Sequence, residues 1–185
     1  MCSSDLPEEF DLVLDVERLS GTGKLLVGLG AFDVVIDNWH ANEHRAGIHR
    51  LDGRHITEYP ARVGAVFKNE TRHRIVYAVR RRSVVVTVDA QDIVRFEGDL
   101  KRLSLDARTA PPKKGAFFLA NELSPFRIHR ACLRPVGERG TSLSTPDRCP
   151  LPAGWARWRC AACGRIAVQN APAMKPCHAR PMQRL

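Results

Sequence analysis

The feature that most constrains the fold is the run FDLVLDVERL near the start of the 185-residue chain. Its apolar side chains, at Phe10, Leu12, Leu14 and Val16, alternate with mainly acidic ones. Because successive side chains of a β-strand point to opposite faces, this period of two predicts a strand with one buried face. The period of about 3.6 that marks an amphipathic helix is not sustained anywhere along the chain.

The same pattern returns several times before residue 137. Most of the runs are separated by turn sequences, among which Asp52-Gly53, inside the polar stretch 38–60, predicts a tight turn. Eight or nine strands with no helix between them predict an all-β fold, an antiparallel β-sandwich of the jelly-roll type. The further apolar or alternating runs lie at 24–30, 31–37, 71–81, 83–99, 115–121 and 124–136.

The second half of this region resembles a known family. TRHRIVYAVRRRSVVVTVDAQDIVRFEGD and the later SPFRIHRACLRPV resemble the C-terminal half of concanavalin A-like, LamG-type jelly rolls. More narrowly they resemble bacterial domains called 3-keto-disaccharide hydrolase. The shared motifs are 86–89 (VTVD), 124–128 (SPFRI) and 134–135 (RP), and the likeness covers 7–136. This chain has Ala90 where the family has glycine, and the family's first strands lie upstream, so an N-terminally truncated jelly roll is expected.

The resemblance implies carbohydrate binding or, in some members, glycoside chemistry. A glycosidase needs two carboxylates about 5 to 9.5 Å apart, one of them with a raised pKa. Asp15 and Glu17 are the nearest local pair, but their alternation places them on the solvated face of a strand. Neither a nucleophile motif nor a phosphate-binding loop is present in the sequence. We therefore expect no enzymatic activity.

Two aromatic residues are the candidate ligand contacts. Carbohydrate-binding surfaces need exposed aromatic rings, and Trp39 and Tyr59 fall in or beside the polar stretch; packing within the loop is the alternative for both. Four histidines crowd the same region, at spacings of no common metal motif, and are interpreted as surface-loop residues rather than metal ligands. They are His40, His44, His49 and His55.

The net charge of +9 comes mostly from arginine. A nucleic-acid-binding protein would gather this charge on one surface, but here it is spread along the chain and aromatic residues make up only 6%. We expect a solvated surface and no specific nucleic-acid partner, with weak anionic-polymer binding at 72–74 and 80–82 as the alternative. No apolar run approaches the roughly 18 to 20 residues of a membrane span, so no membrane partner is expected.

The C-terminal region carries a second, different signal. Cys160 and Cys163 form a C-x2-C knuckle, and Cys177 and His178 would complete a tetrahedral Cys3His set. The segment resembles a desulforedoxin-type or zinc-ribbon-like knuckle in which His178 replaces a cysteine. This set favours Zn, with Fe as the alternative metal. Disulfide pairing and cysteines without a function remain the other interpretations.

Four segments are expected. Residues 1–6 are interpreted as a non-native leader, 7–137 as the β-sandwich, 138–154 as a linker rich in Gly, Pro, Ser and Thr, and 155–185 as the metal knuckle. No secretory signal is visible, and reduced thiolate ligands favour the cytoplasm. The predicted function is that of a lectin-like module whose partner is a carbohydrate or a glycan-bearing molecule. The alternatives are a protein-interaction scaffold of a larger bacterial protein and a fragment of a sugar-acting hydrolase.

Overall fold

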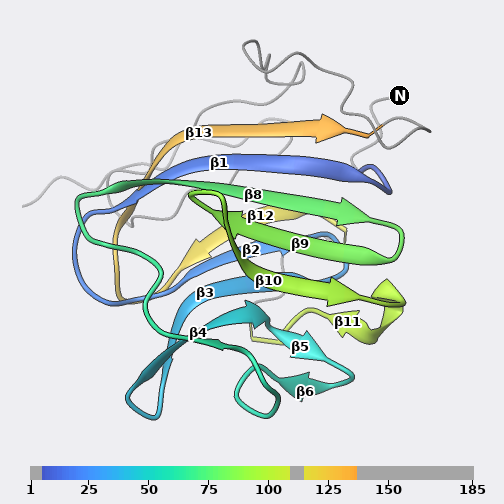
Figure 1. Ribbon diagram of the computed structural model, residues 1–185, viewed down its shortest axis with the longest axis horizontal. Coiled ribbons are helices and arrows are strands. Elements are labelled where there is room, and N and C mark those ends of the chain that lie inside the picture. Colours follow the sequence, from blue (N-terminus) through green and yellow to red (C-terminus); the bar gives the residue numbers. More distant parts are fainter. Residues whose placement is uncertain (1–5, 109–114, 137–185) are drawn as a thin grey trace, which may run out of the picture.

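Two five-stranded sheets face each other across one hydrophobic core (Figure 1). The structure is a computed structural model that describes residues 6–108 and 115–136. All ladders between its named strands are antiparallel, which confirms the all-β sandwich predicted from the alternating runs. The described residues include one short 3-10 helix, η1 (Leu100–Arg102), and no helix with the length and hydropathy of a membrane span. The strands are β1 (Phe10–Arg18), β2 (Leu25–Leu29), β3 (Asp33–His40), β4 (Glu43–Ile48), β5 (Arg50–Leu51), β6 (Arg54–His55), β7 (Arg62–Val63), β8 (Arg72–Arg80), β9 (Ser83–Val88), β10 (Gln91–Glu97), β11 (Leu103–Ser104), β12 (Phe117–Asn121) and β13 (Phe126–Pro135).

The strand order is that of a jelly roll. One sheet, called here the β8 sheet, has the order β10-β9-β8-β1-β13, and the β3 sheet has the order β12-β2-β3-β4-β7. A third, small sheet, β11-β5-β6, lies beside β4 (Figure 1). In the β8 sheet β1, the first strand of the described residues, pairs with both β8 and β13, the last of them. The chain thus crosses between the two facing sheets after β1 and again on either side of β12, as in other double-sheet jelly rolls.

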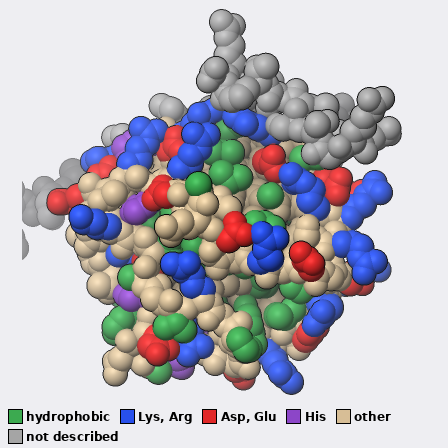
Figure 2. All heavy atoms as spheres, viewed as in Figure 1, with side chains coloured by type: hydrophobic (Ala, Val, Ile, Leu, Met, Phe, Trp, Pro, Cys, Tyr) green, Lys and Arg blue, Asp and Glu red, His purple; other side chains and the backbone are tan. Residues whose placement is uncertain are grey.

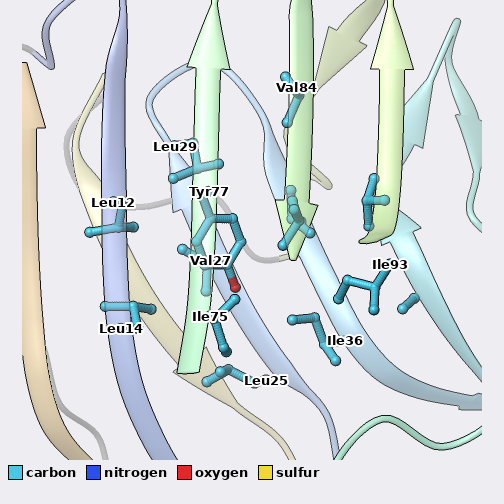
Figure 3. Packing of buried hydrophobic residues seen from close by; sticks show 14 of the residues in the cluster. Leu12, Leu14, Leu25, Val27, Leu29, Ile36, Ile75, Tyr77, Val84 and Ile93 are labelled. Atoms are coloured by element: carbon cyan, nitrogen blue, oxygen red, sulfur yellow. The ribbon is translucent and has the colours of Figure 1, made fainter. Parts of the chain in front are cut away.

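One face of each large sheet builds the core. The four apolar residues that alternate along β1 are buried as predicted, none of them more than 2% exposed. Side chains of β1 and β8 point toward those of β2 and β3 across the space between the sheets (Figure 3). The residues labelled there are Leu12, Leu14, Leu25, Val27, Leu29, Ile36, Ile75, Tyr77, Val84 and Ile93.

Several hairpins close through two-residue turns with positive φ. Asp52 and Gly53 have φ of 52° and 76°, which confirms the tight turn predicted there. Asp89 and Ala90, with φ of 49° and 66°, join β9 to β10 directly as a two-residue turn. Two positive φ values are typical of a type I′ turn, whose twist matches that of the flanking strands. Ala90 adopts this conformation although its Cβ makes a positive φ less favourable than it is for glycine.

The sequence predicts that the polar stretch 38–60 is a connection between strands, but in the structure this stretch itself forms strands. It contains β4 to β6 and the end of β3. The outer half of β4 is polar, and Ala46 and Gly47 are small, so Ile48 is its one large apolar side chain. A strand of that composition lacks the alternation by which strands are found from sequence. Pairing with β3 forms it instead.

Candidate functional site

The hairpin of β3 and β4 presents an exposed tryptophan. Trp39 pairs with His44 across the hairpin, and their rings meet edge to face with centroids 4.7 Å apart. The indole is 53% exposed, and among the described residues it is the exposed aromatic side chain. Ala41 and Asn42 form the two-residue turn beyond it, both with positive φ. The ring is therefore held open to solvent on the paired end of the β3–β4 hairpin.

Tyr59 has different surroundings. The ring is half-buried, and its hydroxyl donates a hydrogen bond to the carbonyl oxygen of Ile48. Burial, with the nearby charge of Asp33, raises the pKa of Tyr59. A Cβ on Gly47 would lie 3.3 Å from the tyrosine oxygen, so the ring rests against the backbone of β4. Tyr59 anchors the 51–61 segment to the β3 sheet.

The two candidate aromatics are on opposite faces of the β3 sheet. Along β4, Ala46 belongs to the core, and His44 lies on the same face two residues earlier. Trp39 is opposite His44 and shares this face, beyond the end of the core. Tyr59 packs against Gly47, which points to the other face. The structure thus places the two residues apart rather than on one concave surface.

A buried polar group lies at the small sheet. His49 is 1% exposed, so the interpretation of all four histidines as surface-loop residues is wrong for this one. Its Nδ1 lies 2.7 Å from Oδ2 of Asp33, which is fully buried at the start of β3. His49 also donates its backbone N–H to the carbonyl of Asp33. These contacts depend on the β3–β4 pairing and not on sequence spacing.

Asp106 completes this group, and nothing in the sequence pattern points to it. It follows β11, is fully buried, and accepts hydrogen bonds from Nε of Arg50 and Nε of Arg108, each at 3.0 Å. One ligand atom each of His49, His55 and Asp106 lie within 4.8 Å of one another. Burial acts to raise the pKa of Asp106, but the Arg108 hydrogen bonds and the positive charges nearby hold it well below its usual range. Burial lowers the pKa of His55, as do His49 and Arg108.

Both carboxylates considered for glycoside chemistry are paired with cationic side chains. Asp15 is 8% exposed rather than solvated, and its carboxylate accepts a hydrogen bond from Arg72 at 2.8 Å. Glu17 accepts from His129 at 2.8 Å and from Arg127 at 3.1 Å. The hydrogen bond from His129, with the Arg127 charge, lowers the pKa of Glu17. This direction is opposite to that of a glycosidase general acid.

The arginine clusters are interspersed with acids. Figure 2 shows both signs of charge distributed over the visible face. Arg80 pairs with Asp11 at 2.7 Å, and Arg81 with Glu8 at 3.4 Å. A shallow hollow of about 620 Å³ next to them has a lining of both signs. It is lined by Glu9, Arg80, Arg81, Arg82, Ser83, Glu97 and Gly98.

The predicted metal knuckle lies outside the described residues. This applies to all four of its ligands, Cys160, Cys163, Cys177 and His178, and the zinc site stays a prediction.

Comparison with known proteins gives no family. No protein-family model matches the chain, and no curated protein matches it. Among solved structures, sheep galectin-11 in complex with glycerol is similar with a TM-score of 0.43 and 11% identity, over 70% of this chain and 92% of the galectin. The alginate lyase AlyC3 is similar with a TM-score of 0.45 and 10% identity, over 71% of this chain and 66% of the lyase.

Proposed function

We propose that the protein is a non-catalytic, lectin-like carbohydrate-binding module, and that a sugar ring stacks on Trp39. The observation that carries the proposal is the 53% exposed indole fixed on the β3–β4 hairpin against the His44 ring. A sugar presents an apolar C–H face, which a flat, rigid aromatic ring can cover at low entropic cost.

Polar groups for the sugar hydroxyls are available on the same hairpin. Asn42 is exposed in the turn, and the His44 ring lies against the indole on the same face. An amide and an imidazole supply both donors and acceptors, as hydroxyl recognition requires. The non-catalytic part of the proposal is supported by the pairing of Asp15 and Glu17 with cationic side chains.

We also propose that Zn²⁺ binds Cys160, Cys163, Cys177 and His178. The support is their sequence spacing and residue types, because a Cys3His set is a common structural zinc site. Zinc binding would supply folding free energy to a segment too short to build a core of its own.

The test is binding of the full chain to an array of immobilised oligosaccharides. We expect saturable binding that Trp39→Ala weakens at least 10-fold, since the stacked ring is the principal contact. Leu123→Ala is the matched control, because Leu123 is an exposed apolar residue, 85% accessible, that lies outside the β3–β4 hairpin. Binding equally weakened by both variants would contradict a site at Trp39.

Fluorescence gives a second measurement of the same contact. The sequence has three tryptophans, so Trp155→Phe combined with Trp158→Phe leaves Trp39 as the reporter. A sugar stacked on the indole changes its emission, and titration with an array-positive oligosaccharide should give the same affinity. The absence of any binding by the folded chain would favour the protein-docking alternative. Release of reducing ends from a bound oligosaccharide would contradict the non-catalytic assignment.

A further inference from the structure

We propose that His49, His55 and Asp106 bind one divalent first-row transition-metal ion of the zinc class. The three residues come from separate segments: His49 lies between β4 and β5, His55 in β6, and Asp106 in the segment after β11. Their ligand atoms lie within 4.8 Å of one another. Two imidazoles and one carboxylate are a donor set typical of zinc and its neighbours, whereas Ca²⁺ and Mg²⁺ prefer oxygen alone. This site is separate from the predicted cysteine knuckle and does not depend on carbohydrate binding.

His49 supplies the observation that points to a ligand. Its Nδ1 is hydrogen-bonded to the buried carboxylate of Asp33, and an ionised carboxylate only accepts, so Nδ1 carries the proton. In the neutral ring Nε2 is then an acceptor with its lone pair directed away from Asp33. This atom is buried and has no hydrogen-bond partner among the described residues. A buried acceptor of this kind is destabilising unless something binds it, and a metal ion does so without a proton.

Asp33 has the role of a supporting residue. Besides holding the His49 ring, it accepts the backbone N–H of Asp106 at 3.4 Å. A carboxylate that orients a metal-binding histidine through its other ring nitrogen is a common outer partner in zinc sites. Here the same carboxylate orients two of the three proposed ligands.

His55 is the adjustable ligand. Its ring lies tilted against that of His49 with centroids 5.0 Å apart, and its Nδ1 is 2.9 Å from Oγ1 of Thr57. The backbone N–H of Thr57 also donates to this Nδ1 at 3.4 Å, which places the proton of the neutral ring on Nε2. Metal binding through Nε2 therefore requires the other tautomer, in which Nδ1 donates to Oγ1 of Thr57. Ligands of one tetrahedral ion, bound at about 2.1 Å, lie about 3.4 Å apart. We therefore expect the half-exposed His55, on its two-residue strand, to move inward when the ion binds.

The arginines around Asp106 set the expected affinity. Arg50 and Arg108 donate four hydrogen bonds to the two oxygens of its carboxylate, so an ion must displace part of this pairing to bind there. The positive charges of these two arginines oppose the binding of a metal cation. We therefore expect a dissociation constant on the order of micromolar, weaker than in closed four-ligand zinc sites.

The experiment separates this site from the knuckle. The full chain with Cys160→Ser, Cys163→Ser and Cys177→Ser is titrated with Co²⁺, followed by visible absorption, and then with Zn²⁺ in competition. We expect one equivalent to bind. His55→Gln should weaken binding at least 10-fold, whereas His40→Gln, at an exposed histidine, should leave it unchanged.

A second measurement covers variants that fail to fold. In the unaltered chain, nitrogen-15 spectra of the histidine rings report which nitrogen binds Zn²⁺, and we expect Nε2 of His49 and of His55 to shift. Zinc shifts confined to His178 would overturn the proposal. So would the absence of Co²⁺ binding in the serine background with a native β-sheet circular dichroism spectrum, or binding there that His55→Gln leaves unchanged.

Discussion

Tyr77 is fully buried between the sheets, and its hydroxyl has no hydrogen-bond partner among the residues that the structure describes. Burial raises its pKa, so the hydroxyl stays neutral. An unpaired buried hydroxyl costs about 1 to 3 kcal/mol. We expect Tyr77→Phe to raise the free energy of unfolding by about 1 kcal/mol in urea or guanidinium titrations, because the ring remains and the unpaired oxygen is removed.

Tyr59 provides the matched control for this substitution. Its hydroxyl does have a partner, the carbonyl oxygen of Ile48, so Tyr59→Phe should lower the free energy of unfolding by about 1 kcal/mol. The same chemical change thus has opposite signs at the two sites. A loss of stability in Tyr77→Phe would mean that its hydroxyl is bound in solution.

Asp89 gives stability a pH dependence. Partial burial acts to raise its pKa, but hydrogen bonds from the Arg74 amide and the His73 ring hold it below the ordinary value of 3.8. A lowered folded-state pKa contributes stability above that value, which is lost as the pH falls through the folded pKa. Since the side chain is 51% exposed, screening limits the contribution to less than about 1 kcal/mol.

The variant that checks this is Asp89→Asn, which keeps a residue suited to positive φ. It should be less stable than the parent at pH 7, and the difference should close as the pH is lowered from 5 to 3, measured by urea unfolding at each pH. A difference that does not change over this interval would exclude the carboxylate charge as its source.

At the scale of residues, sequence reasoning works where burial follows local alternation. Phe10 and Leu14 are buried because a period of two places them on the inner face of β1. Sequence reasoning fails for His49 and Asp33, because their burial depends on the pairing of two strands and not on local alternation. No local pattern distinguishes such a histidine from an exposed one such as His40.

At the scale of elements, the turn between β9 and β10 contains strain that can be removed. Ala90 has φ of 66°, a left-handed conformation that the steric contacts of Cβ make unfavourable and that glycine adopts without this cost. We expect Ala90→Gly to raise the free energy of unfolding by about 0.5 to 1 kcal/mol, the entropy of glycine in the unfolded chain offsetting part of the gain.

The control for the turn is Ala90→Val, which adds a β-branched side chain at the same φ and should destabilise the protein. Thermal unfolding monitored by circular dichroism measures both variants. If Ala90→Gly proves destabilising, the turn does not take the two-residue form in solution.

The elements themselves were predictable to different degrees. The long alternating strands, β1 and β8 above all, follow from the period of two in their sequences. The Asp52-Gly53 turn follows from its composition, since glycine tolerates positive φ. The sequence of β4 does not predict a strand, because its outer residues are polar and the strand forms only through pairing with β3.

At the scale of the whole molecule, the sandwich is expected to fold without residues 137–185. The described core cluster lies between Phe10 and Leu119, and β13 ends at Pro135. A chain ending at Val136 should therefore unfold in one cooperative transition with the β-sheet spectrum of the full chain, in circular dichroism during a urea titration. Loss of the cooperative transition would mean that the sandwich and the C-terminal segment form one folding unit.

The pairing of β1 with β13 has a consequence for synthesis of the protein. Glu17 and Arg127, which are hydrogen-bonded across these strands, are 110 positions apart. At ribosomal speeds of about 5 to 20 residues per second, β1 leaves the exit tunnel on the order of ten seconds before its last neighbour. A nascent chain therefore carries an apolar strand with an open edge, a substrate for chaperones. A nonsense codon anywhere before β13 would leave that edge open permanently, and its product should aggregate.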